Sequence, residues 1–221
     1  MPDTVITVRG SATARYAPEH AIVTGAVGFD GGDRDLVLNA ATLTSDGLTA
    51  RLEQLTDASR GPVTRWSAQD IHVWSERPWS AQGTQLDPVF HAQLAFTATF
   101  TDVDALSTWV DDHARIEGVA IHGVSWGLSP EAERAALRDV RAAAVRDARE
   151  RAEAYATSLG LGHVQPIAIA DPGMLGDAPG EGGGPQLFKA AMAADVAGPQ
   201  LQFTPSDLEI AASVDARFAA R

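Results

Sequence analysis

The stretch SPEAERAALRDVRAAAVRDARERAEAYATSLGLG, residues 129–162, carries the signals of one long helix with both ends marked. Ser129 is a typical N-cap residue, and Pro130 suits the first helical position. Gly160 follows the last turn, where a left-handed residue ends many helices, and the leucine after it can pack back on that turn. We therefore expect a helix that begins at Pro130 and ends just before Gly160.

The two faces of this helix differ in chemistry. Opposite charges at i,i+4 spacing lie on one face, in the pairs Arg146–Glu150, Asp147–Arg151 and Arg149–Glu153. The other face is an apolar stripe of mostly small residues, Leu137, Val140, Ala144, Ala148, Ala152, Tyr155 and Leu159. Because alanine lets a helix approach a sheet closely, we interpret it as a scaffold helix packed on a sheet. Tyr155 is the stripe's candidate for a partner-binding residue.

Strands at both chain ends supply the sheet. Residues 5–16 and 207–218 alternate between apolar and polar side chains, which predicts half-buried strands. Another strand follows the long helix at residues 163–170. Together with the helix, these strands predict an α/β lobe made from residues 1–18 plus 129–221.

A segment of unusual composition interrupts this lobe. Residues 171–204 are rich in glycine, proline and alanine. This composition predicts a mobile loop that holds a helical turn around residues 186–194. Such a loop could act as a lid over a ligand.

The middle of the chain, residues 19–128, predicts the order strand, helix, strand, strand, helix, strand, which is the ferredoxin-like arrangement. Its first helix, at about residues 33–56, has a predicted apolar stripe of Leu36, Ala40, Leu43, Leu48, Leu52 and Leu55. The chain as a whole is thus expected to be one α+β domain of two interleaved lobes, a ferredoxin-like βαββαβ lobe and the α/β lobe.

Composition excludes several classes of function. The net charge of −12 would repel a nucleic acid at long range, so we expect no nucleic-acid partner. Cysteine is absent, which removes disulfides, thiolate metal sites and cysteine nucleophiles. The first residues show no signal peptide, and no stretch approaches the length of a membrane helix, so the expected location is the cytoplasm, with no membrane span.

One motif indicates catalysis. GVSWG, residues 123–127, satisfies the G-x-S-x-G pattern of the nucleophile elbow in α/β-hydrolases, with Ser125 as the nucleophile and His163 and Asp171 as downstream partners. However, Gly127, Leu128 and Ser129 intervene before the helix, whereas the elbow requires its serine on the turn itself. The hairpin-rich chain also lacks the repeated βα units of that fold. A strand position for Ser125 is therefore the favoured interpretation.

Metal and cofactor sites are not indicated. The histidines have no H-x-x-x-H or H-E-x-x-H spacing, and the glycine-rich GEGGG lacks the remainder of a phosphate loop, so we expect neither a metal nor a cofactor. Two tryptophans, Trp74 and Trp79, flank the tip of a hairpin whose arms are residues 63–77 and 89–101. Aromatic side chains exposed at a loop tip often mark interfaces, while local packing of the hairpin is the alternative.

Three segments, taken in order, resemble a known family. ITVRGSATARYAPEHAIVTGAV near the start, the segment from IHGVSWG through the long helix to HVQPI, and LQFTPSDLEIAASVDARF near the end are similar to SIMPL-domain proteins. The resemblance implies an α+β fold and a bacterial protein linked to oxidative-stress defence. Some family members form large homo-oligomers, and an animal member associates with a signalling kinase. No catalytic residue is carried over.

These observations favour a non-enzymatic, self-assembling protein that acts in stress response or as an interaction scaffold, with a homo-oligomer or another protein as partner. Two alternatives stay open. One is a serine hydrolase that uses Ser125, and the other is a small-ligand-binding protein in which residues 171–204 close over a pocket between the lobes.

Overall fold

The computed structural model describes residues 4–56, 61–175, 186–188, 191–192 and 203–221. The described residues form three helices and two antiparallel sheets, which confirms the α+β fold class. The chain divides into two compact units. Unit 1 comprises Met1–Ala17, Leu128–Lys189 and Asp207–Arg221, and unit 2 comprises Pro18–Gly127 and Ala190–Ser206.

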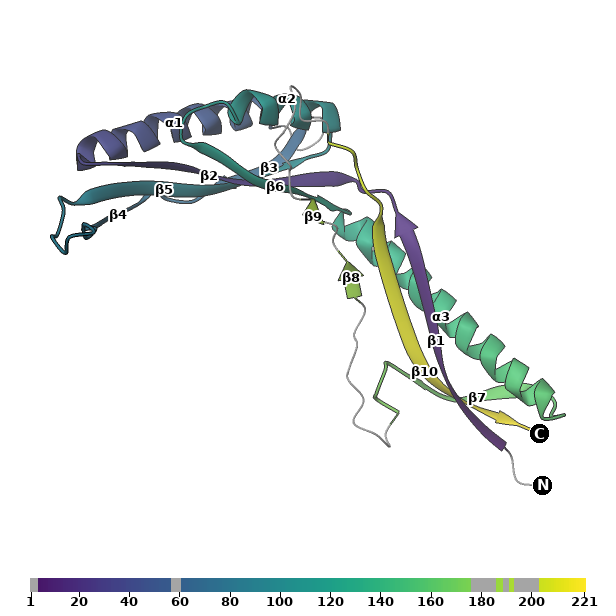
Figure 1. Ribbon diagram of the computed structural model, residues 1–221. Helices are drawn as coiled ribbons and strands as arrows, with labels where there is room; N and C mark the ends of the chain where they lie inside the picture. Colours follow the sequence, from purple (N-terminus) through teal and green to yellow (C-terminus); the bar gives the residue numbers. More distant parts are fainter. Residues whose placement is uncertain (1–3, 57–60, 176–185, 189–190, 193–202) are drawn as a thin grey trace. The chain divides into compact units, whose positions relative to one another are not determined.

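Unit 1 joins both ends of the chain in one sheet. Strand β1 (Thr4–Tyr16) and strand β10 (Leu208–Ala220) pair antiparallel along their whole length, from Thr4 opposite Ala220 to Tyr16 opposite Leu208. Strand β7 (Val164–Ala170) and the short β8 (Gln186–Phe188) pair with the other side of β10. Helix α3 (Pro130–Ser158) covers one face of this sheet, as Figure 1 shows.

The ends of α3 follow the local sequence signals. The Ser129 hydroxyl accepts a hydrogen bond from the Ala132 N–H, and Pro130 begins the helix. Gly160 adopts a left-handed φ of 69°, while the N–H of Leu161 donates to the carbonyl of Ala156. This Schellman arrangement uses a backbone conformation that glycine adopts without the cost of a Cβ clash.

Alanine and glycine set the distance between α3 and the sheet. The buried helix positions repeat every four residues, at Ala136, Val140, Ala144, Ala148, Ala152 and Ala156. The alanines of the predicted stripe are therefore buried, whereas the prediction is wrong for Tyr155 and Leu159, which are exposed. A Cβ at Gly10 on β1 would overlap the Ala144 carbonyl oxygen and lie 2.5 Å from the Ala148 nitrogen. The helix backbone thus rests on the backbone of the strand.

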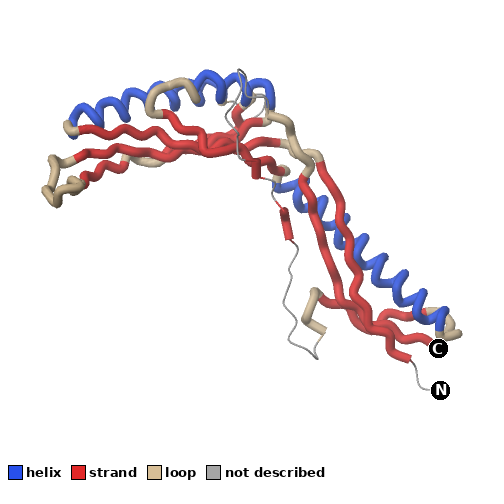
Figure 2. Tube along the Cα trace, in the orientation of Figure 1, coloured by secondary structure: helices blue, strands red, loops and turns tan. Residues whose placement is uncertain are grey.

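The predicted hairpin arm at residues 63–77 forms two strands in unit 2, and the other elements between residues 19 and 128 follow the predicted order. Strand β2 (His20–Gly31) lies between β5 (Val89–Phe100) and β6 (Val119–Gly127), and β3 (Val63–Ala68) and β4 (His72–Glu76) pair with successive parts of β5. Helices α1 (Arg34–Leu55) and α2 (Val103–His113) lie on one face of the sheet (Figures 1 and 2). This order of strands is that of the ferredoxin-like arrangement.

The apolar stripe of α1 differs from the predicted one. Leu36 and Leu43 are exposed, and the buried positions are Val37, Ala41, Ser45, Leu48 and Leu52. The predicted stripe required a step of five residues between Leu43 and Leu48, which turns the helix away from a single face. The side that faces the sheet therefore runs along both halves of the helix, from Val37 to Leu52.

The segment predicted as a loop at residues 171–204 contains strand pairing. Residues 186–188 form β8, and residues 191–192 form β9 (Ala191–Met192), which pairs with β6. The predicted helical turn around residues 186–194 is therefore wrong, because ladder hydrogen bonds to existing strands hold these residues extended. The predicted lid lies largely outside the described residues.

Candidate interaction surfaces

The predicted serine nucleophile lies within a regular strand. Ser125 is on β6, opposite Ile22 of β2 on one side and opposite Ala191 of β9 on the other. His163 and Asp171 flank β7 and belong to unit 1, whereas Ser125 belongs to unit 2. Within the described residues, the structure does not bring the three side chains together in one unit. A serine between two strand neighbours also lacks the strand-to-helix turn that exposes the nucleophile of an elbow.

Trp74 is the centre of a stack of three rings. Its indole ring lies 5.2 Å from the His72 ring and 5.0 Å from the His91 ring, with interplanar angles of 25° and 18°. His91 is opposite Trp74 in the β4–β5 ladder, and its Nε2 lies 3.7 Å from Glu76 Oε1. Trp74 thus packs locally within the hairpin, as the alternative expected, and is also 38% exposed, so its predicted interface role stays a prediction.

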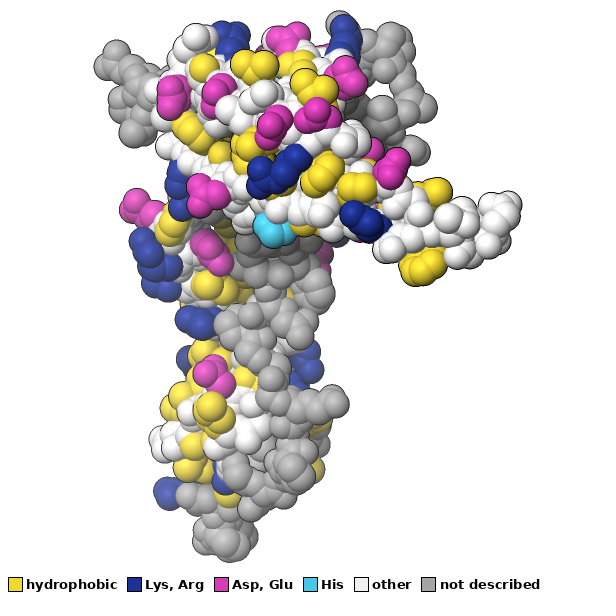
Figure 3. Space-filling model, turned by 90° about the vertical axis from the view of Figure 1, so that its left-hand side faces the viewer, with side chains coloured by type: hydrophobic (Ala, Val, Ile, Leu, Met, Phe, Trp, Pro, Cys, Tyr) yellow, Lys and Arg dark blue, Asp and Glu magenta, His cyan; other side chains and the backbone are white. Residues whose placement is uncertain are grey.

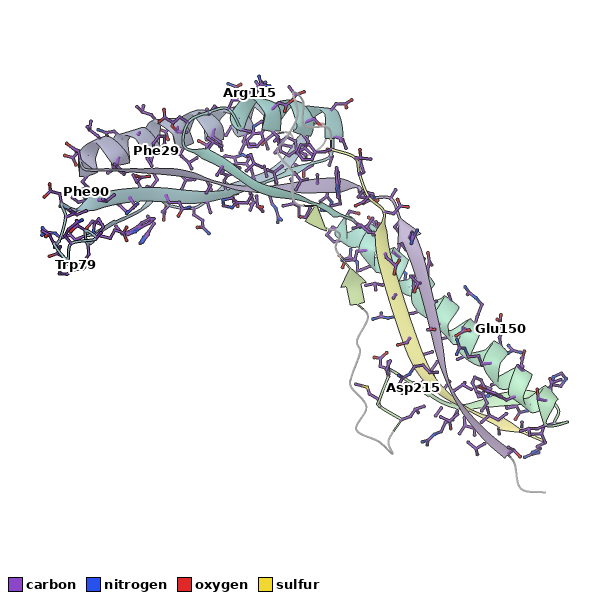
Figure 4. The ribbon with its side chains drawn as sticks, viewed as in Figure 1. Phe29, Trp79, Phe90, Arg115, Glu150 and Asp215 are labelled. Atoms are coloured by element: carbon purple, nitrogen blue, oxygen red, sulfur yellow. The ribbon has the colours of Figure 1, made fainter. Side chains whose placement is uncertain are left out.

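Trp79 is more exposed to solvent than Trp74. It lies at the tip of the hairpin that connects β4 to β5 (Figure 4), and 68% of its surface is exposed. Leu86, on the return arm of the tip, is 47% exposed. Hydrogen bonds between Ser80 and Thr84 and from the Leu86 N–H to the Pro78 carbonyl order the tip around it. We call Trp79 and Leu86 the hairpin-tip residues.

A groove lies beside β7 in unit 1. Its volume is about 470 Å³, and its lining includes Val145 and Arg149 of α3, Ala216 and Phe218 of β10, and residues 164 and 166–169 of β7. Helix α3 packs mainly on β1 and β10 and makes few contacts with β7. The helix therefore leaves the outer strand of the sheet uncovered, and we call this hollow the β7 groove.

An irregularity in β7 increases the apolar area of the groove. Pro166 is opposite Phe218 and Ile169 is opposite Ala216, so the pairing shifts by one residue at this point. Since opposite residues of an antiparallel pair share a face, Ile169 joins Pro166 on the side of α3. Ile169 is 57% exposed there because, among the described residues, α3 packs mainly on β1 and β10 and only slightly on β7.

The side of this sheet that faces away from α3 carries an ion-pair cluster around Asp215 (Figure 4). Arg9 donates two hydrogen bonds to the Asp215 carboxylate, at 2.7 and 3.1 Å, and the Gly173 N–H donates a third at 2.8 Å. The hydrogen bonds from Arg9 lower the pKa of Asp215, against the opposing effect of partial burial. This cluster attaches the segment after β7 to the sheet.

A second carboxylate joins α3 to β1. Asp147 accepts a hydrogen bond from the Ser11 N–H at 2.8 Å and pairs with Arg151 at 2.9 Å. The Ser11 N–H, followed by the Arg151 side chain, lowers the pKa of Asp147. The predicted Asp147–Arg151 pair thus forms, as does Arg149–Glu153 at 2.8 Å.

Other surface features are less specific. Figure 3 shows acidic, basic and hydrophobic side chains interspersed among the described residues of one face. In the described ranges, no cluster of three or more histidine, aspartate or glutamate residues could hold a metal ion. Likewise, none of the helices described here is long and apolar enough to cross a membrane.

Sequence reasoning indicated Trp79 but missed the β7 groove. Two features of the sequence could have indicated the groove. Val145 is an apolar residue beside the charged side of α3, and β7 has no charged residue along its whole length.

A protein-family model described as SIMPL, a protein of unknown function (DUF541), matches residues 6–218. No curated protein matches the chain.

Proposed function

The chain belongs to the SIMPL family of proteins of unknown function, and from this premise we propose that it is a non-enzymatic, self-assembling interaction protein. The observation that carries the proposal is the exposed indole of Trp79 at an ordered hairpin tip. Tryptophan is enriched among the residues that dominate binding energy in protein interfaces. An ordered tip also loses less conformational entropy when it binds.

The surface of Trp79 suits a protein partner. Trp74 stacks with His72 and His91 and is 38% exposed, whereas Trp79 is 68% exposed. Burying a large aromatic surface against a second copy of the chain would remove this exposed area. The resemblance to self-assembling family members supports the same partner.

Substitution at the tip tests the proposal. We expect light scattering and native mass spectrometry of the purified chain to give the mass of an oligomer. We expect Trp79→Ser to weaken association about 30-fold or more, the effect of losing about 2 kcal/mol at an interface hot spot. Leu43→Ser is a matched control, because Leu43 is 74% exposed on α1 and lies outside the tip.

Two outcomes would contradict this function. A monomeric mass at every accessible concentration would exclude self-assembly. Equal effects of the two substitutions would remove the hairpin tip from the interface.

A role in oxidative-stress defence is the finer part of the proposal, and it rests on the family resemblance alone. It predicts that deletion of the gene sensitises its host to peroxide and that the wild-type gene restores resistance. Trp79→Ser should restore less resistance than Leu43→Ser if assembly is required. Equal growth of the deletion strain and its parent under peroxide would contradict the role.

A further inference from the structure

The β7 groove is a second surface, separate from the hairpin tip. Its side chains are apolar apart from one, and three of them are unusually exposed, with Val145 at 40%, Ile167 at 54% and Ile169 at 57%. Its volume of about 470 Å³ lies within the range of small-molecule sites. Burial of these side chains by a ligand would therefore be favourable.

The one charged residue of the lining determines the chemistry of the ligand. Arg149 lies at the α3 wall of the groove in a chain whose net charge is −12. Glu153 accepts a hydrogen bond from its Nε at 2.8 Å. A guanidinium group has five N–H donors, so Arg149 has further donors for a second carboxylate. An apolar hollow with one cation at its wall is complementary to an apolar chain that ends in an anion.

The length of the groove agrees with such a ligand. Its β7 wall runs from Val164 to Ile169, about 17 Å at the rise of a β-strand. We propose that the β7 groove binds a free fatty acid of medium chain length, with the acyl chain along β7 and the carboxylate at Arg149. The site does not depend on self-assembly through the hairpin tip.

Calorimetric titration of the full chain with dodecanoate, below its micelle concentration, tests the proposal. Dodecanoate should bind, and dodecanol, which has the same chain and no charge, should bind about three- to fivefold more weakly because an exposed ion pair contributes little. Arg149→Gln should reduce the affinity for dodecanoate to that for dodecanol. Arg146→Gln, which removes another arginine of α3 outside the lining, should leave it unchanged.

Substitution of the apolar wall tests the position of the acyl chain. Ile169→Asn should weaken the binding of both ligands at least tenfold. Ile116→Asn replaces an isoleucine of unit 2 that is 42% exposed and should have no effect. Both residues are exposed, so both variants are expected to fold, which circular dichroism verifies.

Three results would overturn the proposal. The first is that the wild-type chain binds no dodecanoate at all. The second is that the Ile169→Asn and Ile116→Asn variants bind dodecanoate equally well, and the third is that Arg149→Gln prefers dodecanoate over dodecanol as strongly as the wild type does. Light scattering of each sample tests whether a second copy of the chain, rather than a fatty acid, occupies the groove. A mass lowered by Ile169→Asn, with no dodecanoate bound by the wild type, would assign the groove to a contact between copies.

Discussion

His113 is a buried titratable residue in the core of unit 2. Its ring stacks on Trp109 at 4.3 Å, and its Nδ1 donates to the Trp109 carbonyl oxygen at 2.7 Å. A histidine in the last turn of a helix usually gains from the helix dipole when it is charged. Here burial has the larger effect and lowers the pKa of His113. The folded protein therefore favours the neutral ring.

This pKa shift makes stability depend on pH. The unfolded chain binds a proton at His113 near pH 6.5, whereas the folded chain does so only at lower pH. The free energy of unfolding should therefore fall as the pH is lowered below about 6.5. In His113→Phe, which keeps a ring beside Trp109, urea unfolding at pH 7.5 and 5.5 should show a smaller loss. The exposed His122→Gln is the control, and an unchanged loss in His113→Phe would assign the pH dependence to other groups.

Gly10 also affects stability, because the packing of α3 on β1 leaves no room for a side chain at this position. A Cβ there would meet the backbone of α3, which a rotamer change cannot relieve. We expect Gly10→Ala to lower the free energy of unfolding by about 1–3 kcal/mol. Gly47 on α1 has open space around it, so Gly47→Ala should raise stability by about 0.5–1 kcal/mol. Chemical denaturation measures both, and a neutral Gly10→Ala would show that α3 can shift at no cost.

At the scale of elements, the sequence predicts helices and strands more accurately than it predicts their faces. The caps of α3 are local, so Ser129 and Gly160 could be assigned from their neighbours alone. Which face of a helix or strand is buried depends on its tertiary contacts, which the local sequence does not show. On α1, Leu48 and Leu52 are buried while Leu36 and Leu43 are exposed, and hydrophobicity alone does not distinguish the two pairs.

The candidate surfaces also could be predicted from the sequence only where the signal is local. Trp79 could be identified because a tryptophan among turn residues is visible in the sequence, and its exposure agrees with that interpretation. The β7 groove depends on two features without a local signal, the coverage of β1 and β10 by α3 and the pairing shift beside Pro166. A shift of one residue moves Ile169 to the other face of its strand, and strand alternation cannot predict it.

At the scale of the whole molecule, each unit has its own core although the chain passes between the units several times. Leu48 and Leu52 of α1 are fully buried in unit 2, while the alanines of α3 pack with Ile6 and Phe218 in unit 1. Separate cores allow separate opening, since local stability follows the contacts within a cooperative unit. We therefore expect the two cores to open separately although the chain crosses between the units.

Paired core substitutions distinguish independent units from one cooperative structure. Leu48→Ala should cost about 2–5 kcal/mol, because it leaves a cavity at a residue that is 1% exposed. We expect hydrogen exchange to show faster exchange in β2, β5 and α1 and unchanged protection in β1 and β10. Val140→Ala on α3 should produce the reverse pattern. If either substitution lowers protection equally in both sets of strands, the two units unfold together and the division does not extend to stability.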